Sequence, residues 1–160
     1  MLMMGDKQSA THVAILAPVP EVHLKSASKG GPRVAFATMD WKLFGEDLNQ
    51  ARKNGMPVDV FIYASGPYGS FDPKVSYGAT YVELIEDKYT VKRLGYRPPS
   101  TESDTDDHCF FWVVENLHEL PTEARIPVFD VSGYGKGKAY KKNFVPHRPL
   151  LVEHPHLTLI

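Results

Sequence analysis

The apolar stretches of this sequence are short, and prolines or glycines interrupt them along the whole chain. Thirteen prolines and 12 glycines are spread over 160 residues instead of being pooled in one segment. Such a distribution is typical of many short elements joined by frequent turns. No window of about 18 uninterrupted apolar residues occurs. We therefore expect a soluble, unexported protein of the cytoplasm with no membrane partner.

About seven short segments have the β-branched and aromatic residues, or the alternation of apolar and polar residues, that predict strands. The first is expected to stop at Pro18, because proline cannot donate to a strand ladder. The expected strands cover residues 13–17, 33–38, 57–64, 78–85, 109–114, 126–131 and 150–153, with a shorter one at 89–94.

One segment has the spacing of a good helix. Asp40 can cap a helix from Trp41 to Asn54, and Gly55 is placed to end it. A second, short helix is expected around residues 115–120. Because strands and helices do not alternate regularly, we predict an α+β fold with one principal helix and a bent mixed β-sheet or pseudo-barrel. Residues 1–11 are expected to form a flexible tail and residues 12–160 a single domain.

Charge and cysteine content exclude several classes of site. Eighteen Lys and Arg against 19 Asp and Glu give a formal charge of −1, so only a local charge cluster could attract nucleic acid. Cys109 is the only cysteine, which excludes an intrachain disulfide framework and a zinc site built on several thiolates. The sequence has no phosphate-binding P-loop, no dinucleotide-binding glycine motif and no serine nucleophile elbow.

Histidines gather near the C-terminus, at His147, His154 and His156. Their spacing matches no zinc motif, and Pro155 interrupts a ladder that would align two of them. We therefore expect surface or capping histidines, no metal and no cofactor.

A basic segment precedes these histidines. Residues 133–148 contain four lysines, one arginine and no acid, with Tyr134, Tyr140 and Phe144 between them. This composition favours a flexible loop that contacts phosphates and offers rings for stacking, although a solvated hairpin tip would have the same residues. The expected phosphate-binding residues are Lys136, Lys138, Lys141, Lys142 and Arg148. If the loop binds nucleic acid, the acidic segment 98–107 should lie away from it.

Aromatic residues near the ends of the expected strands form a second candidate cluster. Rings with a few polar groups can hold a flipped base by stacking and by hydrogen bonds to its edge, although such rings often simply fill a core. The expected base pocket consists of Trp41, Tyr63, Ser65, Tyr81 and Trp112.

The order of elements resembles the PUA-like superfamily, which includes the ASCH, EVE and YTH domains. The residues that carry the resemblance are the strand 58–65 (VDVFIYAS), the Gly/Pro loop after it and the strand 78–84 (GATYVEL). The resemblance implies a pseudo-barrel that binds RNA or modified bases in DNA, with a pocket near Trp41, Tyr63, Ser65 and Trp112. The G-x-K-x-x-E-x-R signature of ASCH domains is absent, so the amidohydrolase activity of some ASCH proteins is not expected.

The function predicted from these features is a nucleic-acid-binding module that recognises a base or modified base without turnover. An alternative is a small hydrolase or lyase acting on a nucleoside or a small carbonyl compound. Its general base would be Glu83 or Asp40, beside Thr80, Tyr81 or a histidine. A protein-interaction domain that uses an exposed sheet edge is a third alternative.

Overall fold

The structure of the protein, a computed structural model, describes most of the chain. The described residues are 12–27, 31–40, 42–51, 57–66, 73–107, 109–136, 138–141 and 144–155. The predicted N-terminal tail, Trp41, Gly55, Lys142 and His156 lie outside this part of the chain.

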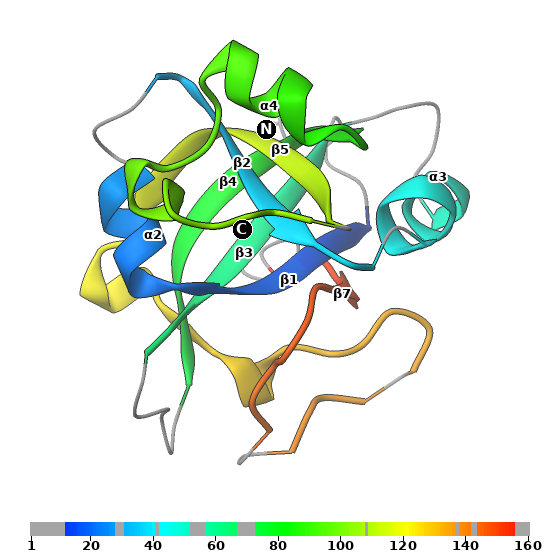
Figure 1. Cartoon of the computed structure of the whole chain (residues 1–160). Coiled ribbons are helices and arrows are strands. Elements are labelled where there is room, and N and C mark those ends of the chain that lie inside the picture. The colour runs from blue at the N-terminus through cyan, green and yellow to red at the C-terminus, as the bar shows by residue number, and fades with distance from the viewer. Residues whose placement is uncertain are drawn as a thin grey trace.

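Within the described residues, seven strands form one mixed sheet, and short helices pack around it (Figure 1). The strands are β1 (Val13–Pro20), β2 (Arg33–Thr38), β3 (Val58–Ser65), β4 (Lys74–Ile85), β5 (Phe110–Glu119), β6 (Ile126–Pro127) and β7 (Leu150–Glu153). The helices are α2 (Glu21–Ala27), α3 (Leu48–Ala51), which follows a π-helical turn at Leu43–Asp47, and α4 (Lys88–Leu94). The predicted α+β class is confirmed.

The sheet is strongly curled. Its strand order is β2-β5-β4-β3-β1-β7, and β6 pairs with β4. β1 and β3 run parallel, and the other pairs are antiparallel. The curl places residues of β2 and β1 around one pocket, although three strands lie between the two in the strand order. The predicted bent, mixed sheet is therefore confirmed.

Trp112 of β5 lies at the centre of the core inside the curl. It is 1% exposed, and the rings of Phe36 and Phe44 pack against it with centroid distances of 5.0 Å and 5.6 Å. The period-2 alternation of β5 sends its neighbours Phe111 and Val113 to the opposite face, where Val91 of α4 covers them. Burying each large apolar side chain contributes about 1.5–3 kcal/mol to stability. Because β5 buries such side chains on both of its faces, it stabilises two packed layers.

The predicted helix after Asp40 exists, but it is not the principal helix of the fold. The segment 43–51 is helical in two short pieces, and α2 and α4 are two further short helices in the described chain. The prediction of a strand at 89–94 is wrong, because Asp87 accepts hydrogen bonds from the backbone N–H groups of Tyr89 and Thr90 and caps α4. Gly95, with φ of 73°, then ends this helix.

Other strand boundaries also differ from the prediction, and β4 begins at Lys74, four residues before the predicted start. Residues 115–119 continue β5 instead of forming a helix, because they pair with β4. β1 continues through Pro18 to Pro20; β7 covers β1 only from Val13 to Leu16, so the edge beyond is free and tolerates a residue without an N–H. In the segment 126–131, only Ile126–Pro127 is a strand, and a 3-10 turn follows.

No helix in the described part of the chain has the length and apolar character needed to cross a membrane.

Candidate functional site

Two neighbouring hollows form a groove across one side of the molecule. The inner pocket, about 600 Å³, lies where the ends of β1 and β2 meet the segments 97–104 and 147–149. The outer pocket, about 640 Å³, lies between the helical segment 42–51, residues 134–136 and residues 148–151. Asp40, Arg148 and Pro149 line both pockets, so the two adjoin. We call the pair the groove.

The floor of the inner pocket is apolar. Trp112 and Phe36 form its base, and Pro18, Val19 and Pro20 form a wall. Phe44 stacks on Trp112 with an interplanar angle of 13°, and Phe36 packs against the same indole at 47°. Because neighbouring rings pack against the indole, Trp112 offers the pocket little more than an edge. The floor can therefore receive a flat ring but provides no open indole face for stacking.

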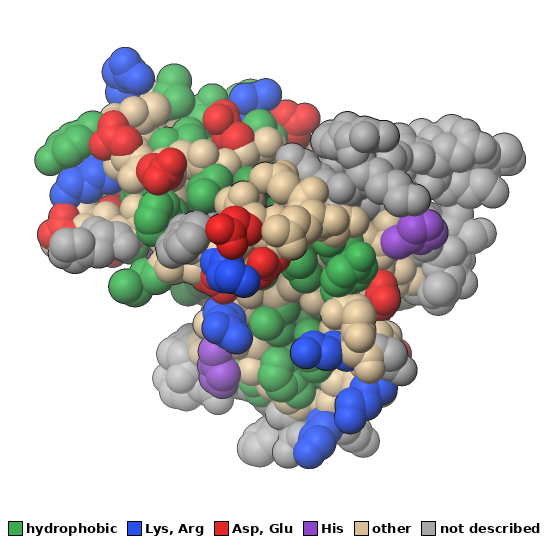
Figure 2. Space-filling model, turned by 90° about the vertical axis from the view of Figure 1, so that its right-hand side faces the viewer, with side chains coloured by type: hydrophobic (Ala, Val, Ile, Leu, Met, Phe, Trp, Pro, Cys, Tyr) green, Lys and Arg blue, Asp and Glu red, His purple; other side chains and the backbone are tan. Residues whose placement is uncertain are grey.

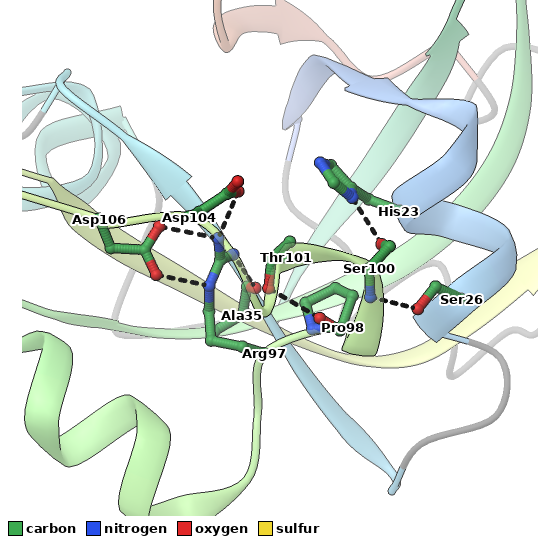
Figure 3. Close-up of polar contacts among 9 residues, drawn as sticks. All are labelled: His23, Ser26, Ala35, Arg97, Pro98, Ser100, Thr101, Asp104 and Asp106. Atoms are coloured by element: carbon green, nitrogen blue, oxygen red, sulfur yellow. Dashed lines mark hydrogen bonds and ion pairs between the residues drawn. The ribbon is translucent and has the colours of Figure 1, made fainter.

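His23 is held on one side of the inner pocket. Its Nδ1 lies 2.6 Å from the hydroxyl of Ser100, and the backbone N–H of Ser100 donates to the hydroxyl of Ser26 at 2.8 Å (Figure 3). α2 follows directly on β1, which brings His23 and Ser26 against the 3-10 turn Pro99–Thr101. The first bond fixes the imidazole against Ser100, and the second fixes Ser100 against α2.

Arg97 orders the opposite wall. Its guanidinium donates two hydrogen bonds to Asp106, at 3.2 Å and 3.1 Å, and a third to the carbonyl of Ala35 at 2.9 Å (Figure 3). Asp106 is buried, so its charge needs this partner. Asp104 also faces the guanidinium, but at 3.8 Å, and its side chain is half exposed. The carboxylate of Asp104 therefore remains open to the pocket.

The rim of the inner pocket is formed by the segment after β2. The N–H of Asp40 donates to the hydroxyl of Thr38 at 3.0 Å, and the carboxylate of Asp40 accepts from the N–H of Leu43 at 3.2 Å. The Asp40 carboxylate thus contacts the first turn of the helical segment, as predicted for a cap, although the residue directly before the π-helical turn is Lys42. Met39 between them lies at the rim and is 74% exposed, which is unusual for a large apolar side chain.

Basic side chains surround the outer part of the groove. Arg148 and Lys136 line the outer pocket, whereas Lys138 and Lys141 are exposed and line neither pocket. We call the surface that carries these four side chains the basic lobe. Lys and Arg side chains gather on this lower lobe in Figure 2. Within the described residues, none of these four side chains has an ion-pair partner, whereas Lys42 nearby pairs with Asp47 at 3.2 Å.

The acidic segment 98–107 forms its ion pairs outside the basic lobe, although Asp104 lines the inner pocket together with Arg148. Asp104 and Asp106 pair with Arg97, and Asp107 pairs with Lys88 of α4. The basic lobe therefore keeps its charge instead of being neutralised by these acids.

Two of the rings expected to serve as stacking platforms have a structural role. Tyr140 and Phe144 stack on each other with a centroid distance of 4.5 Å, and both pack against a buried apolar cluster. Burial raises the pKa of the Tyr140 hydroxyl. Tyr134, by contrast, is 42% exposed and lines the outer pocket.

The residues predicted for the base pocket are not all in the groove. Trp112 lines the inner pocket. Tyr81 is buried in the core and stacks on Phe44 at 5.5 Å. Tyr63 is buried beside Pro18 and Val75, and this burial raises its pKa. Ser65 lies at the end of β3, and neither it nor these two tyrosines lines the groove.

Sequence reasoning missed most of the polar wall of the inner pocket. His23, Thr38, Arg97, Asp104 and His147 line it, and no short motif connects them. Asp104 belongs to a segment that reads as a solvated acidic loop, and His23 lies 81 positions earlier in the chain. Only the curl of the sheet brings them together.

The alternative catalytic residues are divided between the groove and other surfaces. Asp40 lines the groove, as do His23 and His147, whereas Glu83 pairs with Arg33 at 4.0 Å and lines neither pocket. His154 is buried and lies 2.7 Å from the carboxylate of Asp59. In the described chain, no group of three or more His, Cys, Asp or Glu residues is placed to hold a metal ion.

In comparisons with known proteins, no family model matches the chain, and neither a curated protein nor a solved structure matches it significantly. Function is therefore inferred from the residues of the groove.

Proposed function

We propose that this protein is a nucleic-acid-binding module that places a base of RNA or DNA, including a modified base, in the inner pocket. The phosphates on either side of that base would cross the outer pocket. The observation that carries the proposal is that the two pockets adjoin at Arg148, because one ligand can then contact the apolar floor and the basic lobe together. The PUA-like resemblance of the sequence implies the same kind of ligand.

The inner pocket has the features of a site for a flat polar ring. Its floor consists of ring edges, one wall consists of prolines and Val19, and the remaining walls present His23, Thr38 and Asp104. Ligand sites commonly combine an apolar lining with a few placed polar groups. A base removed from its stack loses a few kcal/mol of stacking and pairing, which contacts of this kind must offset. Met39 at the rim is free to cover the ring once it is bound.

The outer pocket and the basic lobe are suited to phosphates. Arg148 and Lys136 line the groove without an ion-pair partner in the described chain, and Lys138 and Lys141 extend the positive surface. Cations of this kind attract the backbone independently of sequence and release counterions on binding. Asp104, which lines the inner pocket but not the outer one, would repel a phosphate in the inner pocket, which favours the base for that position. A cytoplasmic location, as the cysteine content favours, would give access to such partners.

The test is the salt dependence of oligonucleotide binding. Fluorescence anisotropy of labelled single-stranded RNA and DNA would be measured from low to physiological salt for the wild type, K136E, R148E and the control K92E. Lys92 is exposed on α4, so K92E makes the same charge change away from the groove.

We expect K136E and R148E to weaken binding and to reduce the slope of log K against log salt by about 0.7 for each lost contact. K92E should keep the wild-type slope. Equal slopes for all four proteins, or no binding by the wild type, would refute the proposal.

The second candidate function is a small hydrolase or lyase that acts on a nucleoside. The observation in its favour is that Asp40 and His23 line the same pocket, with one nitrogen of His23 held by Ser100. A general base must reach the proton it removes, and both side chains lie where a bound ring would be. Incubation with ribonucleosides followed by chromatography tests this function: a new product lost in D40N or H23A would favour the enzyme over the binding module.

A further inference from the structure

We infer that the ring of Tyr134 stacks on a second base, outside the inner pocket, so that the groove binds two unpaired bases of one single strand. The inference rests on the proposed function, because it adds a neighbouring subsite to the same groove. Tyr134 lines the outer pocket together with Arg148 and Lys136. A strand that runs from the inner to the outer pocket therefore brings a further base to this ring.

Tyr134 exposes a large ring within the groove. Among the exposed large apolar side chains of the described chain, only Met39 and Tyr134 line the groove. The ring of Tyr134 is 42% exposed, and within the described residues no second ring and no cationic group lies over it. Its neighbours Tyr140 and Phe144 cover each other instead. An uncovered aromatic ring beside cations is a suitable platform for a base, because every base has a π-face.

The backbone holds Tyr134 in a tight turn. The N–H of Lys136 donates to the carbonyl of Gly133 at 3.0 Å, and Gly135 between them has φ of 75°, which residues with a side chain rarely adopt. The N–H of Tyr134 itself donates to the carbonyl of Leu151 at 3.1 Å, which ties the turn to β7. A tyrosine on a fixed backbone loses little conformational entropy when a base stacks on it.

The surroundings of the ring suit a single strand. Lys136 lines the same pocket without an ion-pair partner in the described chain, so a phosphate can bind beside the stacked base. In a duplex, neighbouring base pairs cover both faces of each base, and a base must leave this stack before it can contact Tyr134. We therefore expect single strands to bind more tightly than duplexes of the same sequence.

The first experiment measures binding of a labelled eight-nucleotide oligo-dA by fluorescence anisotropy. We expect Tyr134→Ala and Tyr134→Leu to bind about tenfold more weakly than the wild type, because both lose the aromatic face, whereas Tyr134→Phe keeps it. Tyr89→Ala, the control, removes an exposed ring from α4 outside the groove and should keep the wild-type affinity. Wild-type affinity of Tyr134→Leu would overturn the inference, because leucine can pack but cannot stack.

Two further readouts separate stacking from a displaced turn and from duplex binding. The salt dependence of Tyr134→Ala should equal that of the wild type, because no charge is lost. A smaller slope would mean that the substitution acts by displacing Lys136, which contradicts the inference. An unlabelled duplex of the same sequence should compete at least about tenfold less well than the single strand, and equal competition would also contradict it.

The second experiment changes the ligand. An eight-nucleotide strand that keeps one adenine and has abasic residues elsewhere offers a base to the inner pocket and none to Tyr134. Tyr134→Ala and the wild type should therefore bind this strand equally. A tenfold loss in Tyr134→Ala with both strands would overturn the inference while leaving the proposed function intact. If oligo-dA does not bind the wild type, the proposed function itself fails.

Discussion

The guanidinium of Arg97 holds the carboxylate of Asp106 with two hydrogen bonds, at 3.2 Å and 3.1 Å, and both side chains are largely removed from solvent. A third hydrogen bond, from Arg97 to the carbonyl of Ala35, ties the pair to β2. The pair therefore anchors the acidic segment to the sheet and sets the position of Asp104 at the wall of the inner pocket.

The first prediction concerns this anchor. Asp106→Ala leaves the buried Arg97 without its main partner, and we expect a loss of about 3 kcal/mol in the free energy of unfolding. Urea denaturation followed by circular dichroism measures the change. Asp47→Ala removes an acid from the exposed pair with Lys42 and should cost less than about 1 kcal/mol. Equal effects of the two substitutions would contradict the anchoring role of Arg97 and Asp106.

The second prediction concerns pH and the start of α4. Hydrogen bonds from the hydroxyl of Thr90 and from backbone N–H groups lower the pKa of Asp87 below its ordinary value. A carboxyl whose pKa is lower in the folded state stabilises that state above its unfolded pKa. This contribution is lost as the pH falls through the folded pKa. Asp87→Asn removes this titrating group, so the stability of the variant should fall less than that of the wild type as the pH is lowered. Thermal unfolding between pH 6 and pH 3 measures the difference. An unchanged pH profile would contradict the capping interaction.

The strands and the curl of the sheet could be predicted better than the helices. Residues 33–38 and 150–153 form strands with the predicted bounds. The segment 89–94 has the β-branched residues of a strand, but Asp87 and Gly95 provide the cap and the stop of a helix. Pairing with β4 overrides the helix predicted at 115–120. Local pattern was thus reliable where no capping or long-range pairing opposed it.

The site could be predicted only in part, for a related reason. Arg148 and Lys136 belong to a visible run of basic residues, and Trp112 belongs to the most apolar strand, so composition points to them. His23 and Asp104 have ordinary neighbours and meet only because the sheet curls. Tyr63 and Tyr81 have the residue type of a binding pocket, but their strand positions bury them.

The third prediction concerns the stacked pair Tyr140 and Phe144. Their contact at 4.5 Å packs the basic lobe against a buried cluster. Phe144→Ala should lower the free energy of unfolding by about 2 kcal/mol, below the full cost of a buried phenylalanine because the ring is only partly buried. It should also weaken oligonucleotide binding without removing a charge, since Lys136 and Arg148 lie on the same lobe. Phe144→Leu keeps most of the apolar volume and serves as the control; a loss of affinity equal to that of Phe144→Ala would argue against a packing role.

The fourth prediction concerns the thiol of Cys109, which precedes β5. Burial, followed by the negative charges of Asp106, Asp107 and Asp104, raises the pKa of this thiol, and Arg97 only partly opposes the shift. The thiolate is the reactive form, so its population at neutral pH is smaller than that of an ordinary cysteine. We expect iodoacetamide to alkylate Cys109 more slowly than glutathione at pH 7.5, with the ratio approaching one as the pH rises above the ordinary thiol range. Mass spectrometry of quenched samples measures both rates. Asp106→Asn removes the negative charge that raises the pKa of the thiol most and should speed the reaction. A rate faster than that of glutathione in the folded wild type would contradict the shielded environment of the thiol.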